Sequence, residues 1–198
     1  MAHITSIGAG LFSDLSFSQA EDGASGAAAC LANPIAATFA GAFATMQAIT
    51  ANAVTIGLYK RIQNIREFPQ MGVPPNIVNV PKYGSKTSAQ VQGQADSPTF
   101  EVVLNYVPDD WTAAGLGQNL TAGKQHVFRF ALLNTLPTTN YNSTAATGIG
   151  NAGATLNSLY YWVGKLEALQ INPQLTDANQ ATLTISIQSD FYGAFTAA

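Results

Sequence analysis

The chain has 198 residues, of which only 10% are Lys, Arg, Asp or Glu, and its formal net charge is −3. Soluble domains usually carry about 25% charged residues, and a nucleic-acid-binding face shows clustered Lys and Arg, so this composition argues against specific nucleic-acid binding. Cys30 is the only cysteine, which excludes an internal disulfide.

The scarcity of charge indicates that other subunits cover much of the outer surface. Charged groups normally face water, because burying them unpaired is costly, and the chain replaces them with Ala, Gly, Thr, Ser, Asn and Gln. A soluble protein with a neutral polar surface is the alternative. The length suits one domain, or one domain with an extension.

Neither a targeting segment nor a membrane span is predicted. The first fifteen residues, MAHITSIGAGLFSDL, lack a basic region, and Asp14 interrupts any apolar core. The uncharged run from Gly23 to Tyr59 is rich in Ala, Thr and Gly rather than in Leu and Ile. A membrane-spanning helix needs about 20 strongly apolar residues.

Residues 1–53 are expected to form an N-terminal arm or extension. Residues 1–33 contain several glycines and predict an irregular segment with at most a short strand near Ile4 to Ile7. A helix can follow, with Asn33 as its cap and Pro34 in its first turn. Two loose strands are the alternative. The helical face would consist of apolar residues at helical spacing, namely Ile35, Phe39, Phe43, Met46 and Ile49.

Residues 54–198 predict the β-domain. The stretch AVTIGLYKRIQNIREF reads as one strand or two, and Ile77 to Val80 as a short strand that Pro81 places at an edge. Four charged residues of the first stretch are expected near the solvated side: Lys60, Arg61, Arg66 and Glu67.

The clearest strand runs from Thr99 to Val107. Phe100, Val102, Leu104 and Tyr106 point one way and Glu101 and Asn105, with Val103 between them, point the other way, which is typical of a strand buried on one face. The run before it, residues 82–98, is too hydrophilic to bury a face of its own. We expect this run to project from the domain as a loop and to contact another copy through Lys82, Tyr83, Lys86, Gln90, Gln92 and Gln94.

The remaining chain predicts further antiparallel elements. These are a short helix from Asp109 or Asp110 to Leu120, strands at Gln125–Leu136, Leu159–Ile171 and Ala181–Ser189, a long loop at 137–157, and a tail with Phe191, Tyr192 and Phe195. The tail aromatics would close the core or anchor on a neighbour. The predicted fold is mainly β: an antiparallel β-sandwich or partial barrel with one short helix.

No constellation of residues indicates catalysis, a cofactor or a metal. His3 and His126 have no second ligand at zinc-like spacing, and Cys30 lies in an alanine run that would not activate a thiolate. The pair Asp109–Asp110 is explained by a helix start, and GIGNAG at 148–153 follows no buried strand. We therefore expect a protein that is not an enzyme.

The order of these blocks resembles the major tail tube proteins of long-tailed, siphophage-type bacteriophages. The similarity covers Ile62 to Ile187 and consists of IQNIREFP, GSKTSAQVQGQADSPTFEVVLNYVP, DDWTAAGLGQNL, HVFRFALL, YYWVGKLEALQINPQLTD and ATLTISI. Gly164, the Pro-Asp turn and the final strand are especially similar to that family. The first 55 residues depart from it.

The resemblance implies a virion protein, made in the host cytoplasm, that forms hexameric rings. The rings would stack, together with other tail proteins, into a tube that passes DNA without reading its sequence. The family's loop that bridges to the next ring corresponds to residues 82–98, and Glu101 and Glu167 are candidates to face an acidic channel. Ordinary surface charges are the alternative for these two glutamates. Tail type, contractile or not, stays open.

Two alternatives belong to other classes of function. The first is another virion β-sandwich, such as a tail terminator or a head decoration protein. The second is a glycan-binding module that would use Tyr141, Tyr160, Tyr161 and Trp162 as a stacking platform.

Overall fold

The structure is a computed structural model of the full chain. It describes residues 12–18, 26–43, 45–46, 58–62, 64–70, 77–84, 86–93, 99–108, 123–133 and 158–196. Most of the described residues lie in antiparallel strands, which confirms the predicted fold class.

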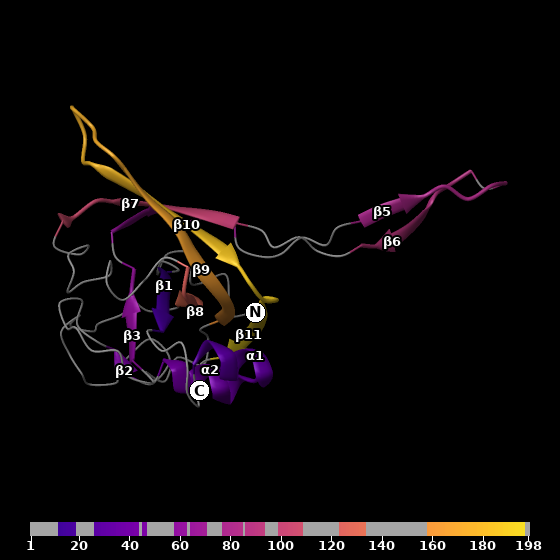
Figure 1. Cartoon of the computed structure of the whole chain (residues 1–198), viewed down its shortest axis with the longest axis horizontal. Helices are drawn as coiled ribbons and strands as arrows, with labels where there is room; N and C mark the ends of the chain where they lie inside the picture. Colours follow the sequence, from indigo (N-terminus) through magenta and orange to yellow (C-terminus); the bar gives the residue numbers. More distant parts are fainter. Residues whose placement is uncertain are drawn as a thin grey trace, which may run out of the picture.

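The elements are shown in Figure 1. In chain order they are β1 (Phe12–Ser18), α1 (Ala27–Ala32), α2 (Ala36–Ala42), β2 (Thr45–Met46), β3 (Leu58–Arg61), β4 (Ile65–Glu67), β5 (Ile77–Val80), β6 (Ala89–Gln92), β7 (Thr99–Asn105), β8 (Gln125–Leu133), β9 (Ser158–Asn172), β10 (Gln180–Ile187) and β11 (Tyr192–Thr196).

The main sheet folds over onto itself. Its strand order is β2-β3-β1-β8-β9-β10-β7-β4, with β11 paired to β9. Leu15 of β1 and Val102 of β7 belong to one buried cluster, although three strands separate β1 from β7 in the sheet. Two halves of the sheet therefore face each other as in a sandwich. Among the described strands, β2 and β4 stand unpaired at the two ends of this order and β11 pairs only with β9, so the sheet does not close into a barrel.

Strand β9 joins the two halves. Its residues 158–165 pair with β8, and its residues 164–172 pair with β10. Gly164 lies at the junction, where a Cβ atom would stand 2.8 Å from the backbone oxygen of Ser186. The close approach of the two backbones explains why the chain has a glycine here.

Trp162 is the centre of the first core. Its ring stacks on Phe128 at 5.6 Å and on Phe191 at 4.7 Å, and the ring of Phe100 meets it edge-on at 5.5 Å. Phe191 therefore contributes to the core of its own chain, which is one of the two roles expected for the tail aromatics. Such ring pairs stabilise a core beyond the area that they bury.

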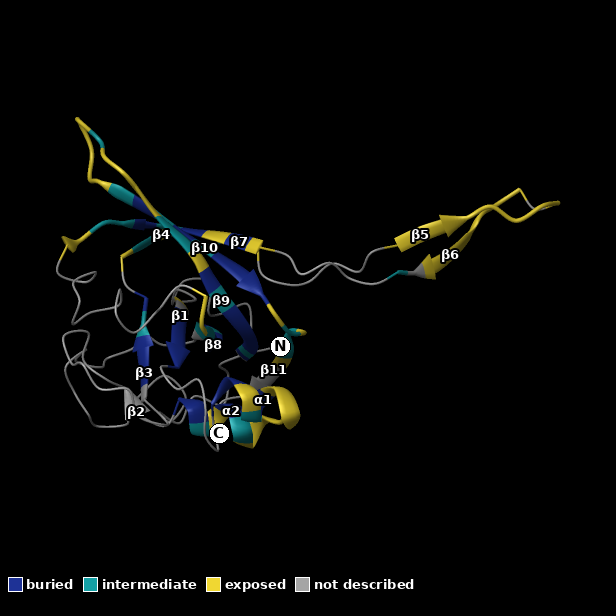
Figure 2. Cartoon of the chain, in the orientation of Figure 1, coloured by how far each residue is buried: buried dark blue, intermediate teal, exposed yellow. Residues whose placement is uncertain are grey.

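The second core lies on the other face of β8 and β9, beneath the helices. Phe39 of α2 stacks on Tyr161 at 4.9 Å and packs against Tyr192 at 5.3 Å. Phe43 contacts both Tyr59 and Tyr161. Both faces of the central strands are thus buried (Figure 2).

The N-terminal region is not the extension that we expected. Strand β1 lies inside the main sheet, between β3 and β8, and α1 contributes Ala27 and Cys30 to the second core. The described parts of residues 1–53 therefore belong to the body of the domain. The short strand predicted near Ile4 to Ile7 lies outside the described residues.

The predicted helix begins later and ends earlier than expected. Asn33 caps the C-terminus of α1 rather than starting a helix, and Ile35 is the N-cap of α2. Pro34 explains the division, because it disfavours helical geometry at the preceding residue. Phe39 and Phe43 are buried as predicted, whereas Ile35 is 49% exposed and Met46 lies in β2.

Other expectations for the body are largely confirmed. Strands β7, β8, β9 and β10 lie where the alternating patterns predict them, and the stretch before Phe68 forms two strands, β3 and β4. The prediction for Lys60 is wrong: it is fully buried, whereas Arg66 and Glu67 are exposed. The helix at 109–120 and the loop at 137–157 lie outside the described residues.

Candidate inter-subunit hairpin

Strands β5 and β6 form a two-stranded sheet of their own. They pair antiparallel, with Ile77 opposite Gln92, Val78 opposite Val91, Asn79 opposite Gln90 and Val80 opposite Ala89. Figure 1 shows this hairpin extending away from the body, and every one of its side chains described between Ile77 and Val91 is exposed. We call residues 77–93 the hairpin.

One face of the hairpin is entirely apolar. Residues that lie opposite each other in a ladder share a face, and alternate residues of one strand do so too. The register therefore places Val78, Val80, Ala89 and Val91 together. The exposed fractions of the three valines are 48%, 44% and 53%. Asn79 and Gln90 lie on the opposite, mostly polar face.

This arrangement leaves the hairpin incomplete as a folded unit. An isolated two-stranded hairpin is marginally stable at best in water, and an apolar face needs something to pack against. None of the described residues of the body covers the four apolar side chains (Figure 2). The hairpin therefore has the features of a binding surface.

The far end of the hairpin is basic and aromatic. Lys82, Tyr83 and Lys86 are exposed in the connection between β5 and β6, and the exposed fraction of Tyr83 is 106%. Gly84 adopts a φ of 80°, which favours glycine at this turn. The sequence from 77 to 93 contains these two lysines and no Asp or Glu, so the hairpin carries a charge of +2.

The run that was predicted to project lies partly in the hairpin and differs from the prediction in its form. Lys82, Tyr83, Lys86 and Gln90 lie in the hairpin, and the backbone of Gln92 pairs with Ile77, whereas Gln94 lies outside the described residues. The run is a strand pair rather than a loop, and it includes β5. Our sequence analysis did not identify the apolar face, although the alternation in IVNV and AQVQ contains that signal.

Glu101 and Glu167 lie on one outward face of the sheet. Glu101 is opposite Thr184 of β10, and Glu167 lies beside the same strand, where its Oε1 accepts a hydrogen bond of 2.5 Å from Ser186 Oγ. Both glutamates are exposed, while Leu104 and Leu166 on the same two strands are buried. The structure thus brings the two predicted residues to the same surface.

The side chains that are best suited to catalysis or metal binding are buried in the body of the domain. His126 is buried, and its Nδ1 donates to the carbonyl oxygen of Ser18 at 3.1 Å, since a carbonyl can only accept. Burial raises the pKa of the Cys30 thiol to about 11, which opposes thiolate formation. Burial also lowers the pKa of Lys60 to about 8.

Arg129 is held by aromatic rings rather than by a described carboxylate. Its guanidinium carbon lies 4.5 Å from the centre of the Phe43 ring and 4.7 Å from that of Tyr59. Its Nε donates to Ser16 Oγ at 3.3 Å. Within the described part of the chain, no group of three His, Cys, Asp or Glu side chains is placed to hold a metal ion.

The aromatic platform required by the glycan-binding alternative is not available. Trp162 is fully buried and Tyr161 is 3% exposed, so neither offers a free ring face. Tyr160 is half-buried, and Tyr141 lies outside the described residues. Among the described helices, none is long and apolar enough to span a membrane.

No model of a protein family matches the sequence, and no curated protein matches it.

Proposed function

We propose that this protein is a structural subunit of a phage tail tube. Six copies form a ring, and the rings stack into a conduit for the genome within the virion. The observation that carries the proposal is the hairpin, whose apolar face of Val78, Val80, Ala89 and Val91 lies exposed in the single chain. A second copy of the same chain provides the surface that covers it.

The composition of the chain supports assembly. With only 10% charged residues, the chain has few groups to keep a large surface in water. Among the described strands, β2 and β4 stand at the ends of the strand order and β11 pairs only with β9, so these short strands leave backbone groups available for pairing. Hydrophobic patches and open edges are features that protein–protein interfaces use.

The face with Glu101 and Glu167 is proposed to line the channel. Its described neighbours on β10 are uncharged, namely Thr182, Thr184 and Ser186. Lys165 of β9, which lies opposite Ser186 and is half-buried, is the described basic residue on this face, so Glu101 and Glu167 leave it weakly acidic. Such a surface would let a polyanion pass without holding it firmly, because phosphate binding depends on clustered Lys and Arg. The role is structural rather than catalytic.

Electron microscopy of the purified protein tests this proposal. We expect hollow rings or tubes whose cross-section has sixfold symmetry. Closed rings arise from head-to-tail contacts when the rotation between copies closes. A strictly monomeric protein at high concentration in every salt condition would refute the proposal.

The hairpin also suits another virion component, such as a tail terminator or a head decoration protein. Both would use the same exposed apolar face to bind neighbours. Labelling the protein along intact particles separates these roles. A tube subunit labels the whole tail length, whereas the alternatives label one end of the tail or the head.

A further inference from the structure

The segment that follows β10 lies along β9 and covers part of its edge. Gln188 N donates to Val163 O at 2.7 Å, and Val163 N donates to Ser189 Oγ at 2.9 Å. Strand β11 then pairs with β9 between Ser158 and Tyr161. Because β8 pairs with the other side of this stretch, β11 covers what would otherwise be a free strand edge. We call residues 188–196 the strap.

Two neighbouring aromatic residues of the strap contact different cores. Phe191 stacks on Trp162 of the first core, with a distance of 4.7 Å between the ring centres. Tyr192 packs against Phe39 of the second core, with a distance of 5.3 Å. Such ring pairs add to the stability that burial alone gives. The strap therefore ties the two faces of the central strands together.

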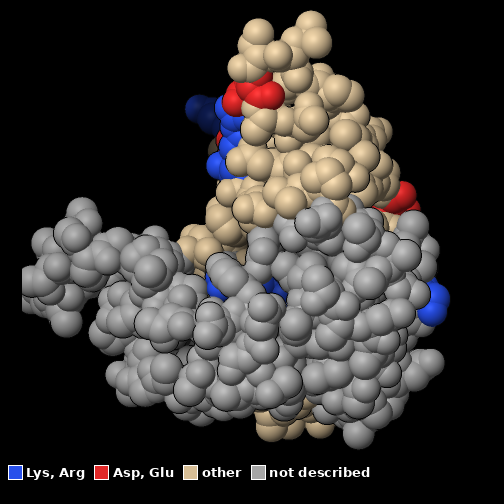
Figure 3. Space-filling model, turned by 90° about the vertical axis from the view of Figure 1, so that its left-hand side faces the viewer, with Lys and Arg blue, Asp and Glu red and all other residues tan. Residues whose placement is uncertain are grey.

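Helices α1 and α2 need packing to be stable. They contain six and seven residues, and neither has a side-chain hydrogen bond at its N-cap. Isolated helices shorter than about 12 residues are marginal in water. Residues 26–43 contain no Lys, Arg, Asp or Glu, so no ion pair can fix the two helices. Figure 3 shows the same scarcity of charge on one side of the molecule, where most described residues are neither basic nor acidic.

Phe39 connects these helices to the strap. Its ring lies in stacked geometry on Tyr161 of β9 at 4.9 Å, and it also contacts Tyr192. Figure 1 shows β11 beside α1 and α2, at the end of the body away from the β9–β10 turn. Loss of the Tyr192 ring therefore weakens the packing of α2 as well as that of the strap.

We infer that the strap and the helices α1 and α2 open and close together as one unit, while the central strands stay folded. Proteins commonly open in contiguous cooperative units of this kind. Opening frees the β9 edge between Ser158 and Tyr161 and uncovers one face of the Trp162 ring. The closed unit keeps this edge from pairing with other chains. The inference concerns the single chain and goes beyond the proposed tube subunit.

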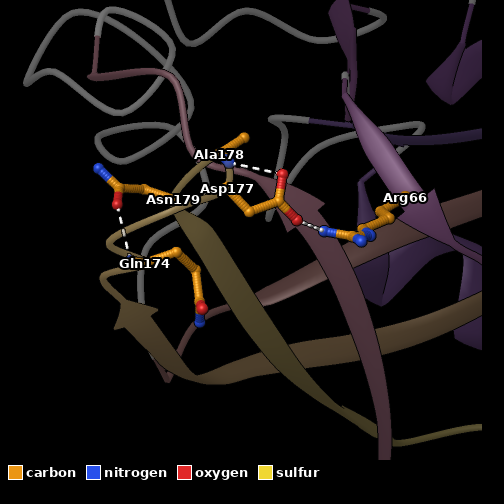
Figure 4. A network of polar contacts seen from close by, with 5 residues as sticks. All are labelled: Arg66, Gln174, Asp177, Ala178 and Asn179. Carbon is orange, nitrogen blue, oxygen red and sulfur yellow. Dashed lines mark hydrogen bonds and ion pairs between the residues drawn. The ribbon is translucent and has the colours of Figure 1, made fainter.

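The β9–β10 turn provides a control, because polar contacts fix it without the strap (Figure 4). Arg66 of β4 forms an ion pair of 3.1 Å with Asp177. Ala178 N donates to Asp177 Oδ1 at 2.8 Å, and Gln174 N donates to Asn179 Oδ1 at 3.0 Å. Asp177→Asn weakens the ion pair and loosens this exposed turn. It should leave the strap and the helices unchanged.

Hydrogen exchange, measured at a protein concentration below that of assembly, tests the inference. The amides of Cys30 and Phe39 are hydrogen-bonded within the helices, and that of Gln188 within the strap. In the wild type these three amides should share one opening free energy and exchange faster than the amides of β10. Tyr192→Ala should accelerate the exchange of Cys30 and Phe39 by roughly tenfold, which corresponds to about 1.4 kcal/mol. The amides of β10 should keep their rates, as should all three amides in Asp177→Asn.

The Phe39→Leu variant tests the coupling in the other direction. It removes the ring but keeps most of the apolar volume, and it should accelerate the exchange of Gln188. Three results would overturn the inference: helix amides that exchange as slowly as those of β10, a Tyr192→Ala variant with unchanged helix amides, or equal acceleration of β10 in that variant. None of these results bears on the tube subunit, which electron microscopy tests separately.

Discussion

Substituting Gly164 by alanine tests how the two halves of the sheet are joined. An added Cβ would lie 2.8 Å from Ser186 O and 3.2 Å from both Ile185 Cγ2 and Phe128 Cε2. The first of these atoms belongs to the backbone of β10, where Ser186 is paired with Lys165. It cannot move aside as a side chain would, so one strand must shift.

The size of the effect follows from this geometry. Ordinary van der Waals contact of a Cβ begins at 3.4 Å, so the backbone must move by 3.4 minus 2.8, or 0.6 Å. Overpacking of a core typically costs about 1–3 kcal/mol. The smaller conformational freedom of alanine in the unfolded chain offsets about 0.4–1 kcal/mol of this. The expected net loss is about 1–2 kcal/mol.

Urea and thermal unfolding measure this loss. For a chain of this size, about 1–2 kcal/mol corresponds to a decrease in melting temperature of roughly 2–8 °C. Gly84→Ala is the matched control: no atom lies within 4 Å of its added Cβ, and any backbone strain is confined to the hairpin. A Gly164→Ala variant as stable as the wild type would show that β9 and β10 do not approach each other as described.

Three further predictions concern the core, the pH dependence and the hairpin. Trp162→Ala should lose about 3–5 kcal/mol of unfolding free energy, because Trp162 is fully buried; a near-native urea midpoint would place the ring outside the core. Burial lowers the pKa of Lys60 from 10.5 to about 8, so above pH 8 the unfolded chain binds more protons than the folded chain, and stability rises with pH. Cys30, whose pKa burial raises from 9.0 to about 11, opposes this above pH 9. The wild type should therefore gain stability between pH 8 and 9 while Lys60→Met does not, and equal slopes in chemical denaturation would contradict this account. Replacing residues 77–93 by a short Gly-Ser linker should leave the melting temperature unchanged, because the described side chains from Ile77 to Val91 are exposed, and should abolish assembly; light scattering that still shows polymers would refute the role of the hairpin.

The strands with one buried face were predictable from sequence. In β7, Phe100, Val102 and Leu104 alternate with exposed or half-buried residues, and β10 follows the same rule. A period of two reports burial whenever one face meets water. The hairpin contains the same alternation with a period of two in shorter strands. Our sequence analysis did not identify its apolar face, because the run also contains many polar residues.

Strand β1 could not be recognised by the same pattern. Leu15 and Phe17 are buried on one face, but Ser16 and Ser18 are equally buried on the other. Serine is common in exposed segments, so the sequence of this strand was interpreted as part of an irregular segment. The predicted exposure of Lys60 was wrong for a related reason, because the burial of this side chain depends on strands and helices that are distant in sequence. Pro34, in contrast, offered a local signal for the division between α1 and α2.

Negative-stain electron microscopy of the wild-type protein beside the Val91→Asp variant tests most directly whether the hairpin joins copies of this chain. Hollow rings or tubes in the wild type, and single particles without polymer in the variant, are the predicted result. Dispersed monomers in both samples, or equal polymers in both, would contradict it.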